Sequence, residues 1–153
     1  MLKQVKVNKM TENDIKGVYA VELQCFGESA FPMDWFTDVV YDENCHYYVA
    51  YLDDKPVGYV GMHVNSHTEK PYCKIATIAV SKEYRNRGIG RLLIEKLLNI
   101  ANSLQISAVK LEVETDNVAV FLYESFGFKI TEVLENYYTI ENKDAYVMWL
   151  HQE

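Results

Sequence analysis

The periods of hydrophobic and polar positions divide the chain into helical and extended segments. Apolar residues recur at helical spacing in four stretches, and we expect helices over residues 15–26, 33–43, 91–104 and 117–126. Alternating or β-branched runs predict strands over residues 2–10, 46–52, 56–64, 73–80, 108–113, 128–134 and 144–150. This interspersed order is typical of an α+β (α/β) fold, with a mixed sheet of about seven strands flanked by about four helices.

Residues with strong preferences for helix ends support these boundaries. Thr11, followed by Asp14 in the first turn, is expected to cap the first helix, and Gly27 to end it. Pro32 suits the start of the second helix. Gly127 is expected to end the fourth helix in the left-handed conformation, before the next strand begins.

Length and composition agree with one folded domain. Of the 153 residues, 49% are hydrophobic and 24% are charged, and no linker or repeat interrupts them, so residues 1–153 are expected to form a single domain. The N-terminal segment lacks the apolar run of a secretory signal, and no stretch reaches about 18 uninterrupted apolar residues. We therefore expect a cytoplasmic protein without a membrane partner.

Cysteine and histidine spacing predicts neither disulfides nor a metal site. The three cysteines, at positions 25, 45 and 73, form no CxxC pair and are expected to be buried small hydrophobic residues. The four histidines, at positions 46, 63, 67 and 151, show no ligand spacing such as HxxxH.

Charge is unevenly distributed along the chain. The net charge is −7, and a nucleic acid would require a broad cationic surface, so no nucleic-acid partner is expected. Between Lys82 and Lys96, five basic and two acidic residues give +3, which leaves −10 for the remainder. The pattern predicts an anionic ligand at the basic segment and a cationic partner attracted to the rest of the surface.

The basic segment contains a loop suited to phosphate. Its sequence, Arg85–Gly90 (RNRGIG), lies between the strand that ends at Val80 and a helix that begins near Gly88. Two glycines allow close approach of a ligand, and the N–H groups and dipole of a helix start attract anions. The nucleotide motifs GxxxxGK[ST] and GxGxxG are absent, so a tight strand-to-helix turn without a ligand remains an alternative.

Residues around the loop make its assignment more specific. Residues 75–98, IATIAVSKEYRNRGIGRLLIEKLL, resemble the acetyl-CoA-binding strand, loop and helix of the GCN5-related N-acetyltransferase (GNAT) superfamily, whose R/Q-x-x-G-x-G/A pattern matches Arg85, Gly88 and Gly90. Residues 111–128, LEVETDNVAVFLYESFGF, resemble the strand and helix that follow it. The resemblance implies the GNAT fold, acetyl-CoA (coenzyme A) as cosubstrate and no metal. The cofactor-binding residues it implies are Ile78, Ala79, Val80, Arg85, Asn86, Arg87, Gly88, Ile89, Gly90, Arg91, Asn117 and Tyr123.

Two further segments resemble the RimI type within this superfamily. They are AFPMDWF at residues 30–36 and ENYYTIENKDAYVMWL at residues 135–150. RimI-type enzymes acetylate the N-terminal amine of a ribosomal protein, so the resemblance implies a protein N-terminus as partner, supplied by a basic ribosomal protein, and a monomer or homodimer. The chain departs from the type in one place: Asn117 and Tyr123 are six positions apart instead of seven, which puts the position of Asn117 in doubt.

The reaction implied by the resemblance requires a base for the amine and an acid for the departing thiolate. Glu112 matches the glutamate that serves as general base in RimI-type enzymes, and Tyr123 matches the tyrosine that protonates coenzyme A. Glu114 points the same way as Glu112 in a regular strand and is the rival base. Without the resemblance, Glu112 would be read as a solvent-facing strand residue and Tyr123 as core packing.

The resemblance also suggests residues that flank the acceptor. Phe31 and Pro32 are expected between the first two helices, and Tyr137 and Tyr138 in the loop before the last strand, although paired tyrosines could equally cover a sheet edge. A small cationic amine, such as a polyamine or an aminoglycoside, is an alternative acceptor that the acidic remainder would also suit. A non-catalytic acetyl-CoA-binding module is the alternative from another functional class.

Overall fold

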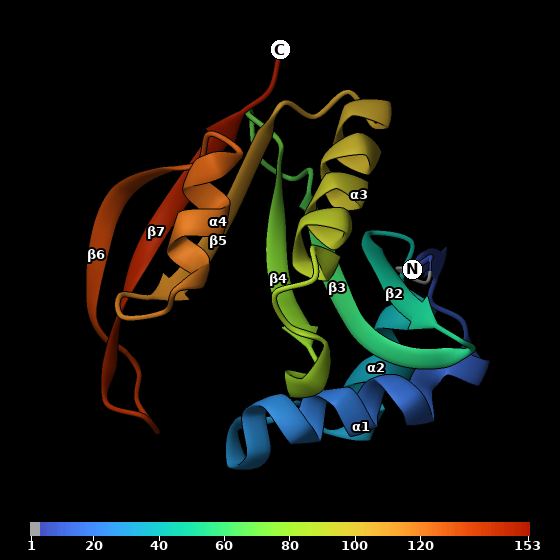
Figure 1. The fold of residues 1–153 in the computed structure, drawn as a ribbon. Helices are drawn as coiled ribbons and strands as arrows, with labels where there is room; N and C mark the ends of the chain where they lie inside the picture. The colour runs from blue at the N-terminus through green and yellow to red at the C-terminus, as the bar shows by residue number, and fades with distance from the viewer. Residues whose placement is uncertain (1–3) are drawn as a thin grey trace. The chain divides into compact units, whose positions relative to one another are not determined.

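The structure is a computed structural model that describes residues 4–153. Its strands are β1 (Lys6–Lys9), β2 (Cys45–Leu52), β3 (Lys55–Asn65), β4 (Tyr72–Val80), β5 (Ala108–Glu114), β6 (Lys129–Tyr138) and β7 (Lys143–His151). Its helices are α1 (Ile15–Phe26), α2 (Met33–Val40), α3 (Ile89–Ser103) and α4 (Ala119–Ser125), with short 3₁₀ segments at Glu12–Asp14, Gly27–Ser29 and Lys82–Tyr84. The expected mixed sheet with four helices is confirmed (Figure 1).

The seven strands follow the order β1-β2-β3-β4-β5-β7-β6. Strands β4 and β5 pair in parallel, whereas β1–β2, β2–β3, β5–β7 and β6–β7 pair antiparallel. The chain divides into two compact units. Unit 1 comprises the residues up to His63 together with Ala76–Ile100, and unit 2 comprises Val64–Ile75 together with Ala101–Glu153.

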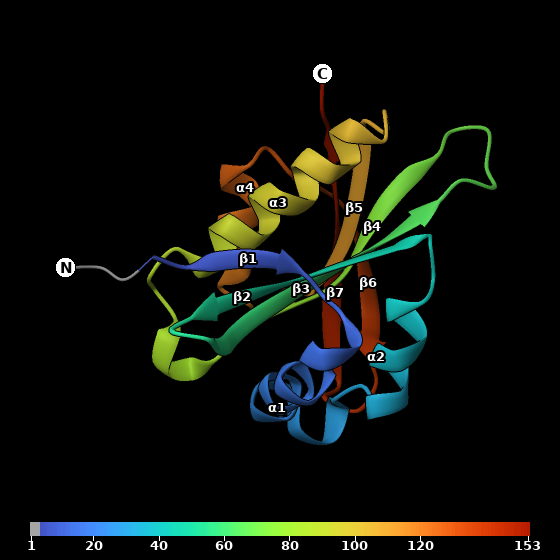
Figure 2. The same ribbon diagram turned by 90° about the vertical axis from the view of Figure 1, so that its right-hand side faces the viewer.

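Unit 1 is built in layers around its part of the sheet. Helices α1 and α2 cover one face, and α3 covers the other (Figure 2). Between the sheet and the first two helices, the core contains the fully buried side chains of Val18, Phe36 and Tyr59. Helix α3 is amphipathic, and its buried residues Leu93 and Leu97 are one turn apart, which is why helical periodicity located this element in the sequence.

Unit 2 contains β5, β6, β7 and α4. Strand β5 alternates strictly: its residues 109, 111 and 113 are buried, and residues 110, 112 and 114 point to the opposite face. Two of the residues that α4 buries are Val120 and Tyr123. In the β5–β7 ladder Glu112 pairs with Val147, and the residues on either side of Glu112 are paired as well. The uninterrupted ladder therefore fixes the backbone of Glu112.

Several boundaries differ from the expectations. The strand expected over residues 2–10 is observed at Lys6–Lys9, and residues 2 and 3 lie outside the described part of the chain. Helix α2 ends at Val40 instead of residue 43, with Tyr41 as its C-cap. The helix expected over residues 91–104 begins at Ile89, as the loop sequence indicated, and ends at Ser103.

The largest difference concerns the segment that contains the paired tyrosines. Tyr137 and Tyr138 were expected in a loop, but they lie in β6, which continues to Tyr138 across an irregularity after Leu134. At this irregularity Asn136 has a positive φ of 49°, and its N–H donates to the Asp144 carboxylate at 2.8 Å. The polar residues there broke the alternating pattern, so the sequence hid the continuation of the strand.

Candidate active site

The loop after β4 forms a strand-to-helix turn with an open backbone. Asn86 and Gly88 both have positive φ, 64° and 83°. The Leu92 N–H donates to the Gly88 carbonyl at 3.1 Å, so the N–H groups of Ile89 and Gly90 belong to the first helical turn, where no preceding turn supplies an acceptor. A Cβ added at Gly88 would meet no atom within 4 Å. The geometry suits a diphosphate that approaches the backbone closely.

The arginines of the loop have different surroundings. Arg85 donates from Nε to the Val80 carbonyl at 2.9 Å, and its Nη2 contacts the Cys25 Sγ of α1 at 3.5 Å, so Arg85 ties the loop to the end of β4. The guanidinium of Arg87 lies 5.3 Å from the centre of the Tyr84 ring. Arg91 lies in the first turn of α3. Direct phosphate contact by these three side chains stays a prediction.

The end of β4 presents alternate residues to opposite sides. The Ser81 N–H donates to the Val57 carbonyl at 2.8 Å, and a Cβ on Gly58 would lie 2.9 Å from the Ala79 carbonyl oxygen. The backbone groups of Ala79 therefore face β3. The backbone groups of Ile78 and Val80 therefore point away from β3. The Val80 carbonyl already accepts from Arg85, which leaves Ile78 as the better backbone contact for a pantetheine amide.

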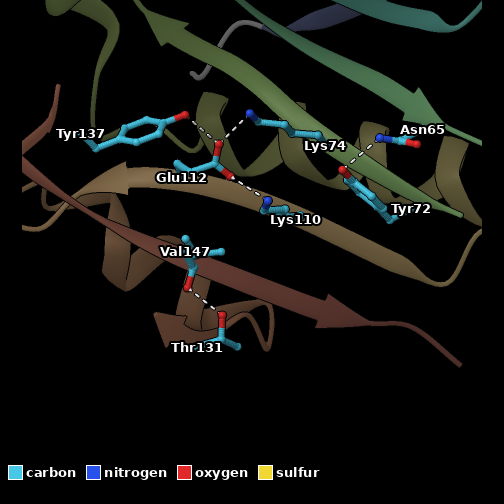
Figure 3. A network of polar contacts seen from close by, with 8 residues as sticks. All are labelled: Asn65, Tyr72, Lys74, Lys110, Glu112, Thr131, Tyr137 and Val147. Atoms are coloured by element: carbon cyan, nitrogen blue, oxygen red, sulfur yellow. Dashed lines mark hydrogen bonds and ion pairs between the residues drawn. The ribbon is translucent and has the colours of Figure 1, made fainter. Parts of the chain in front are cut away.

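In unit 2, three side chains converge on Glu112 (Figure 3). The Lys74 Nζ lies 2.6 Å from Glu112 Oε1, and the Tyr137 hydroxyl donates to the same oxygen at 3.0 Å. The Lys110 Nζ is 3.9 Å from the other oxygen, Oε2, which is buried and has no hydrogen-bond partner among residues 4–153. The Glu112 side chain is 6% exposed. Oε1 is thus held by two partners, whereas Oε2 has only the longer ion-pair contact with Lys110 within the described residues.

The pKa of Lys74 is raised from its ordinary value. Burial, the largest single influence, lowers it, but the hydrogen bond and the charge of Glu112 together outweigh burial. Lys74 therefore stays a charged donor at neutral pH. Sequence analysis missed this residue, although a lysine between Cys73 and Ile75 in an otherwise apolar strand was a signal that a partner exists.

Glu114, the rival base, has a different environment. Its partner is Lys143, with Nζ at 3.5 Å, and the same lysine contacts Asp116 at 2.8 Å. The Glu114 side chain is 29% exposed. Its carboxylate is therefore part of an exposed ion-pair group, while that of Glu112 is desolvated and held in one orientation.

Tyr123 lies in α4 and is 5% exposed. Its ring packs edge to face against Phe128, with centroids 6.0 Å apart. Burial raises the pKa of its hydroxyl above the ordinary range, so Tyr123 is a neutral phenol at physiological pH. A neutral phenol can donate a proton, as the predicted role requires.

Asn117 precedes α4 and does not belong to it. Its side-chain Oδ1 accepts the N–H of Ala119 at 2.8 Å, and its own N–H donates to the Glu114 carbonyl at 3.0 Å. The helix was expected to start at Asn117 itself. The Asn117 carboxamide oxygen therefore caps the turn before the helix. The contact of Asn117 with the pantetheine arm stays a prediction.

The acceptor candidates fall into both units. Phe31 stacks on Trp35 in unit 1, with centroids 4.6 Å apart, and Pro32 is the exposed N-cap of α2. In unit 2, the rings of Tyr137 and Tyr138 meet edge to face at 5.0 Å, and Tyr137 also contacts Glu112. Burial raises the pKa of both tyrosines, so both are neutral donors.

The remaining predictions concern cysteines, metals and membranes. Cys73 is buried as expected, whereas Cys25 and Cys45 are only partly buried. In the described part of the chain, no group of three or more histidine, cysteine or acidic residues could hold a metal ion. None of the helices within residues 4–153 is long and apolar enough to cross a membrane.

Comparison with known proteins places these features in a family context. A model of the Acetyltransferase (GNAT) family matches residues 15–128. The chain is 34% identical over 146 residues to the N-alpha-acetyltransferase RimI of Mycobacterium tuberculosis, which covers 94% of this chain and 90% of that protein. It is 30% identical over 156 residues to a putative ribosomal protein bS18-alanine N-acetyltransferase of Bacillus subtilis, which covers 98% and 97%.

Two other similarities concern length and fold. An uncharacterized protein of Mycobacterium leprae is 36% identical over 147 residues, and this chain spans 40% of its length. The crystal structure of the ribosomal-protein-S18-alanine N-acetyltransferase from Escherichia coli has a TM-score of 0.86 at 24% identity, over 97% of this chain and 94% of that chain. The second similarity shows that the fold is shared.

Proposed function

Because this chain belongs to the acetyltransferase (GNAT) family, we propose that it transfers the acetyl group of acetyl-CoA to the N-terminal α-amine of a protein. The observation that carries this proposal is Glu112, a desolvated carboxylate whose Oε2 has no hydrogen bond within residues 4–153. Such an oxygen can take the proton that an attacking amine must lose. The names of the relatives from M. tuberculosis and B. subtilis support the same acceptor class.

The loop after β4 is the proposed site for the diphosphate of acetyl-CoA. The space beside Gly88 and the first-turn N–H groups of α3 fit an anionic, backbone-bound ligand. Ile78 supplies backbone groups for the pantetheine arm, and Arg87 and Arg91 add positive charge. Bound there, acetyl-CoA supplies an activated thioester, and the chain's own residues supply proton transfer.

Glu112 Oε2 is the proposed proton acceptor, directly or through a water. Lys74 and Tyr137 hold the other oxygen, so the carboxylate keeps one orientation. The reference pKa is about 8 for an α-amine and about 10.4 for a lysine side chain. A carboxylate base therefore acts far more readily on a protein N-terminus than on a lysine, which favours the α-amine as acceptor.

Tyr123 is the proposed general acid. Its hydroxyl proton goes to the coenzyme A sulfur as the carbon–sulfur bond breaks and the carbon–nitrogen bond to the amine remains. As a neutral phenol, Tyr123 carries the proton that this role requires. Oxygen donors of this type contribute about a hundredfold or more to rate, so removal of the hydroxyl has a measurable effect.

The finer assignments are also proposals. A basic ribosomal protein as acceptor is supported by the name of the B. subtilis relative and by the charge of −10 outside residues 82–96. One catalytic domain over residues 1–153 is supported by a family match that includes residues of both units. We also propose that the enzyme is cytoplasmic and either monomeric or homodimeric.

A thiol-release assay with acetyl-CoA tests the proposal. We expect turnover with peptides that begin with Ala, Ser or Met, and none with the same peptides blocked at the N-terminus or with spermidine. Glu112→Gln and Tyr123→Phe should each lower kcat by about a hundredfold or more. Glu114→Gln is the matched control and should retain activity, because its carboxylate belongs to the exposed Lys143 group.

Other outcomes select the alternatives. Preference for spermidine over free N-termini would assign the protein to small-amine acetyltransferases. Acetyl-CoA binding without turnover of any amine would leave a non-catalytic acetyl-CoA-binding module. Loss of activity in Glu114→Gln but not in Glu112→Gln would exchange the two carboxylates.

A further inference from the structure

Glu22 is a buried acid that the proposed mechanism does not use. It lies in α1, its side chain is 1% exposed, and it forms no ion pair within residues 4–153. Removing a carboxylate from water without a cationic partner is costly, and an apolar or amide residue of similar size would avoid that cost. A glutamate at this position therefore calls for a reason other than packing.

Both oxygens of Glu22 accept hydrogen bonds from defined donors. Oε2 accepts the backbone N–H of Phe31 at 2.9 Å, and Oε1 accepts the hydroxyl of Tyr59 at 2.5 Å. Burial raises the pKa of the Glu22 carboxyl, and the two hydrogen bonds oppose this rise. The two acceptor oxygens of the carboxylate thus serve one donor each.

The first donor belongs to the segment proposed to receive the acceptor. Phe31 precedes α2, and its ring is fixed by stacking on Trp35 at 4.6 Å. With the N–H held by Glu22 and the ring held by Trp35, both the backbone and the side chain of Phe31 have a fixed position. Pro32 follows directly, so the orientation of this exposed residue depends on the same anchor.

The second donor connects Glu22 to the strand proposed to hold the cofactor. The Tyr59 hydroxyl also lies 3.2 Å from Thr77 Oγ1 in β4, immediately before Ile78. Tyr59 is fully buried and packs edge to face on Phe36 of α2 at 5.5 Å. All of these residues belong to unit 1, so one hydrogen-bonded chain runs from Phe31 through Glu22 and Tyr59 to the residue before Ile78.

We propose that Glu22 is a positioning residue of the acceptor site, which fixes the Phe31 backbone against the β3–β4 part of the sheet without touching the substrate. This inference rests on the proposed N-terminal acetyltransferase function. It assigns a role to the acid in α1 that neither the cofactor loop nor the Glu112 group explains.

Glu22→Met tests the proposal, because methionine has a similar size and offers no acceptor oxygen to Phe31 or Tyr59. Glu22→Gln is less suitable, because its carboxamide oxygen can accept the Phe31 N–H while its NH₂ group donates to the Tyr59 hydroxyl, which can then donate to Thr77 Oγ1. In Glu22→Met we expect KM for an N-terminal peptide to rise about tenfold, while KM for acetyl-CoA changes less than about twofold, since a lost charge-assisted hydrogen bond has this order of effect. Thermal stability should not fall, because the buried charge is removed as well.

Two variants accompany it. Tyr59→Phe keeps the Phe31 bond to Glu22 and should raise KM for the peptide less than Glu22→Met does. Glu28→Gln changes an exposed acid in the 3₁₀ segment Gly27–Ser29 and should leave both KM values unchanged. An unchanged peptide KM in folded Glu22→Met, or equal rises in both KM values, would overturn the proposal.

Amide hydrogen exchange at Phe31 gives a readout that does not depend on activity. The Phe31 N–H should exchange about tenfold faster in Glu22→Met than in the wild type, because its acceptor is lost. If the wild type acetylates no N-terminal peptide and Phe31 still loses protection, the proposed function fails while the anchor stands. If the wild type is active and Phe31 protection is unchanged in the variant, the anchor fails while the function stands.

Discussion

At the scale of single residues, the partner of a carboxylate decides what it can do. Glu112 and Glu114 stand on the same face of β5, two positions apart. Lys74 and Tyr137 fix the first in a desolvated position, whereas Lys143 pairs with the second at the surface. An exposed ion pair contributes little and restricts its members weakly, so only Glu112 has the fixed orientation that proton transfer requires.

The ion pair between Lys74 and Glu112 leads to a prediction about lysine reactivity. Glu112→Gln should lower the pKa of Lys74, because the glutamate raises it and burial, which lowers it, remains. At pH 9 a lower pKa increases the fraction of neutral amine, so Lys74 should react faster in the variant. The rate of Lys74 modification by acetic anhydride, followed by mass spectrometry, measures this change.

Glu114→Gln is the control for this experiment, since Glu114 contacts Lys143 and not Lys74. Lys110, Tyr72 and Tyr137 also face Lys74 or its partner, and they are the same in both variants. An equal Lys74 rate in the wild type and in Glu112→Gln would show that the pair does not set the protonation of this lysine.

At the scale of elements, the strand, loop and helix from β4 to α3 form the cofactor candidate. The loop depends on backbone conformation more than on its arginines, because Arg85 is already bound to Val80 at the end of β4 and to Cys25 of α1. Gly88 combines a φ of 83° with open space beside its Cα. A side chain at this position would be strained by the positive φ and would fill the open space.

Gly88→Ala should therefore weaken acetyl-CoA binding and lower stability at the same time. The positive φ costs an alanine about 1–2 kcal/mol, or about 2–4 °C in Tm for each kcal/mol. The new methyl group occupies space proposed for the ligand, so KM for acetyl-CoA should rise about tenfold or more. Thermal unfolding and initial-rate kinetics measure the two effects.

Gly27→Ala is the matched control in the same unit. Gly27 also has a positive φ, 52°, and also has no atom within 4 Å of an added Cβ, but it ends α1 outside the loop. It should lower Tm by a similar amount and leave KM for acetyl-CoA unchanged. Equal KM values for acetyl-CoA in Gly88→Ala and Gly27→Ala would remove Gly88 from the cofactor site.

The elements also show where local pattern is sufficient and where it fails. The end of α1 at Gly27 and the start of α3 near Gly88 follow from residue preferences that act within one turn. The end of α2 and the continuation of β6 to Tyr138 do not. The second of these depends on Asp144, which accepts the Asn136 N–H from eight positions away and supports an irregular strand.

At the scale of the whole molecule, charge distribution is the main property that bears on partners. The chain carries −7, and residues 82–96 contribute +3 to this total. An acidic surface attracts a cationic protein N-terminus over distances comparable to the screening length, about 10 Å at 0.1 M salt. The basic segment attracts the phosphates of coenzyme A in the same manner.

Salt should consequently affect basic and neutral acceptors differently. KM for a peptide with several lysines or arginines after its N-terminal residue should rise severalfold between about 0.02 and 0.3 M NaCl. A neutral peptide with the same first residues should show little change at saturating acetyl-CoA. Parallel responses of the two peptides would mean that long-range charge does not select the acceptor.

The sequence by itself determined the kind and order of the elements, the glycine loop and the family resemblance, because each depends on residues close together in the chain. It also indicated Glu112 and Tyr123, through motifs that occur in fixed spacing along one segment. Only the tertiary structure decided the partners: Lys74 and Tyr137, 38 and 25 positions from Glu112, meet one of its oxygens, and Glu22 meets Tyr59, 37 positions away. Such contacts depend on strand register and helix packing, which bring distant residues together and which no local pattern specifies.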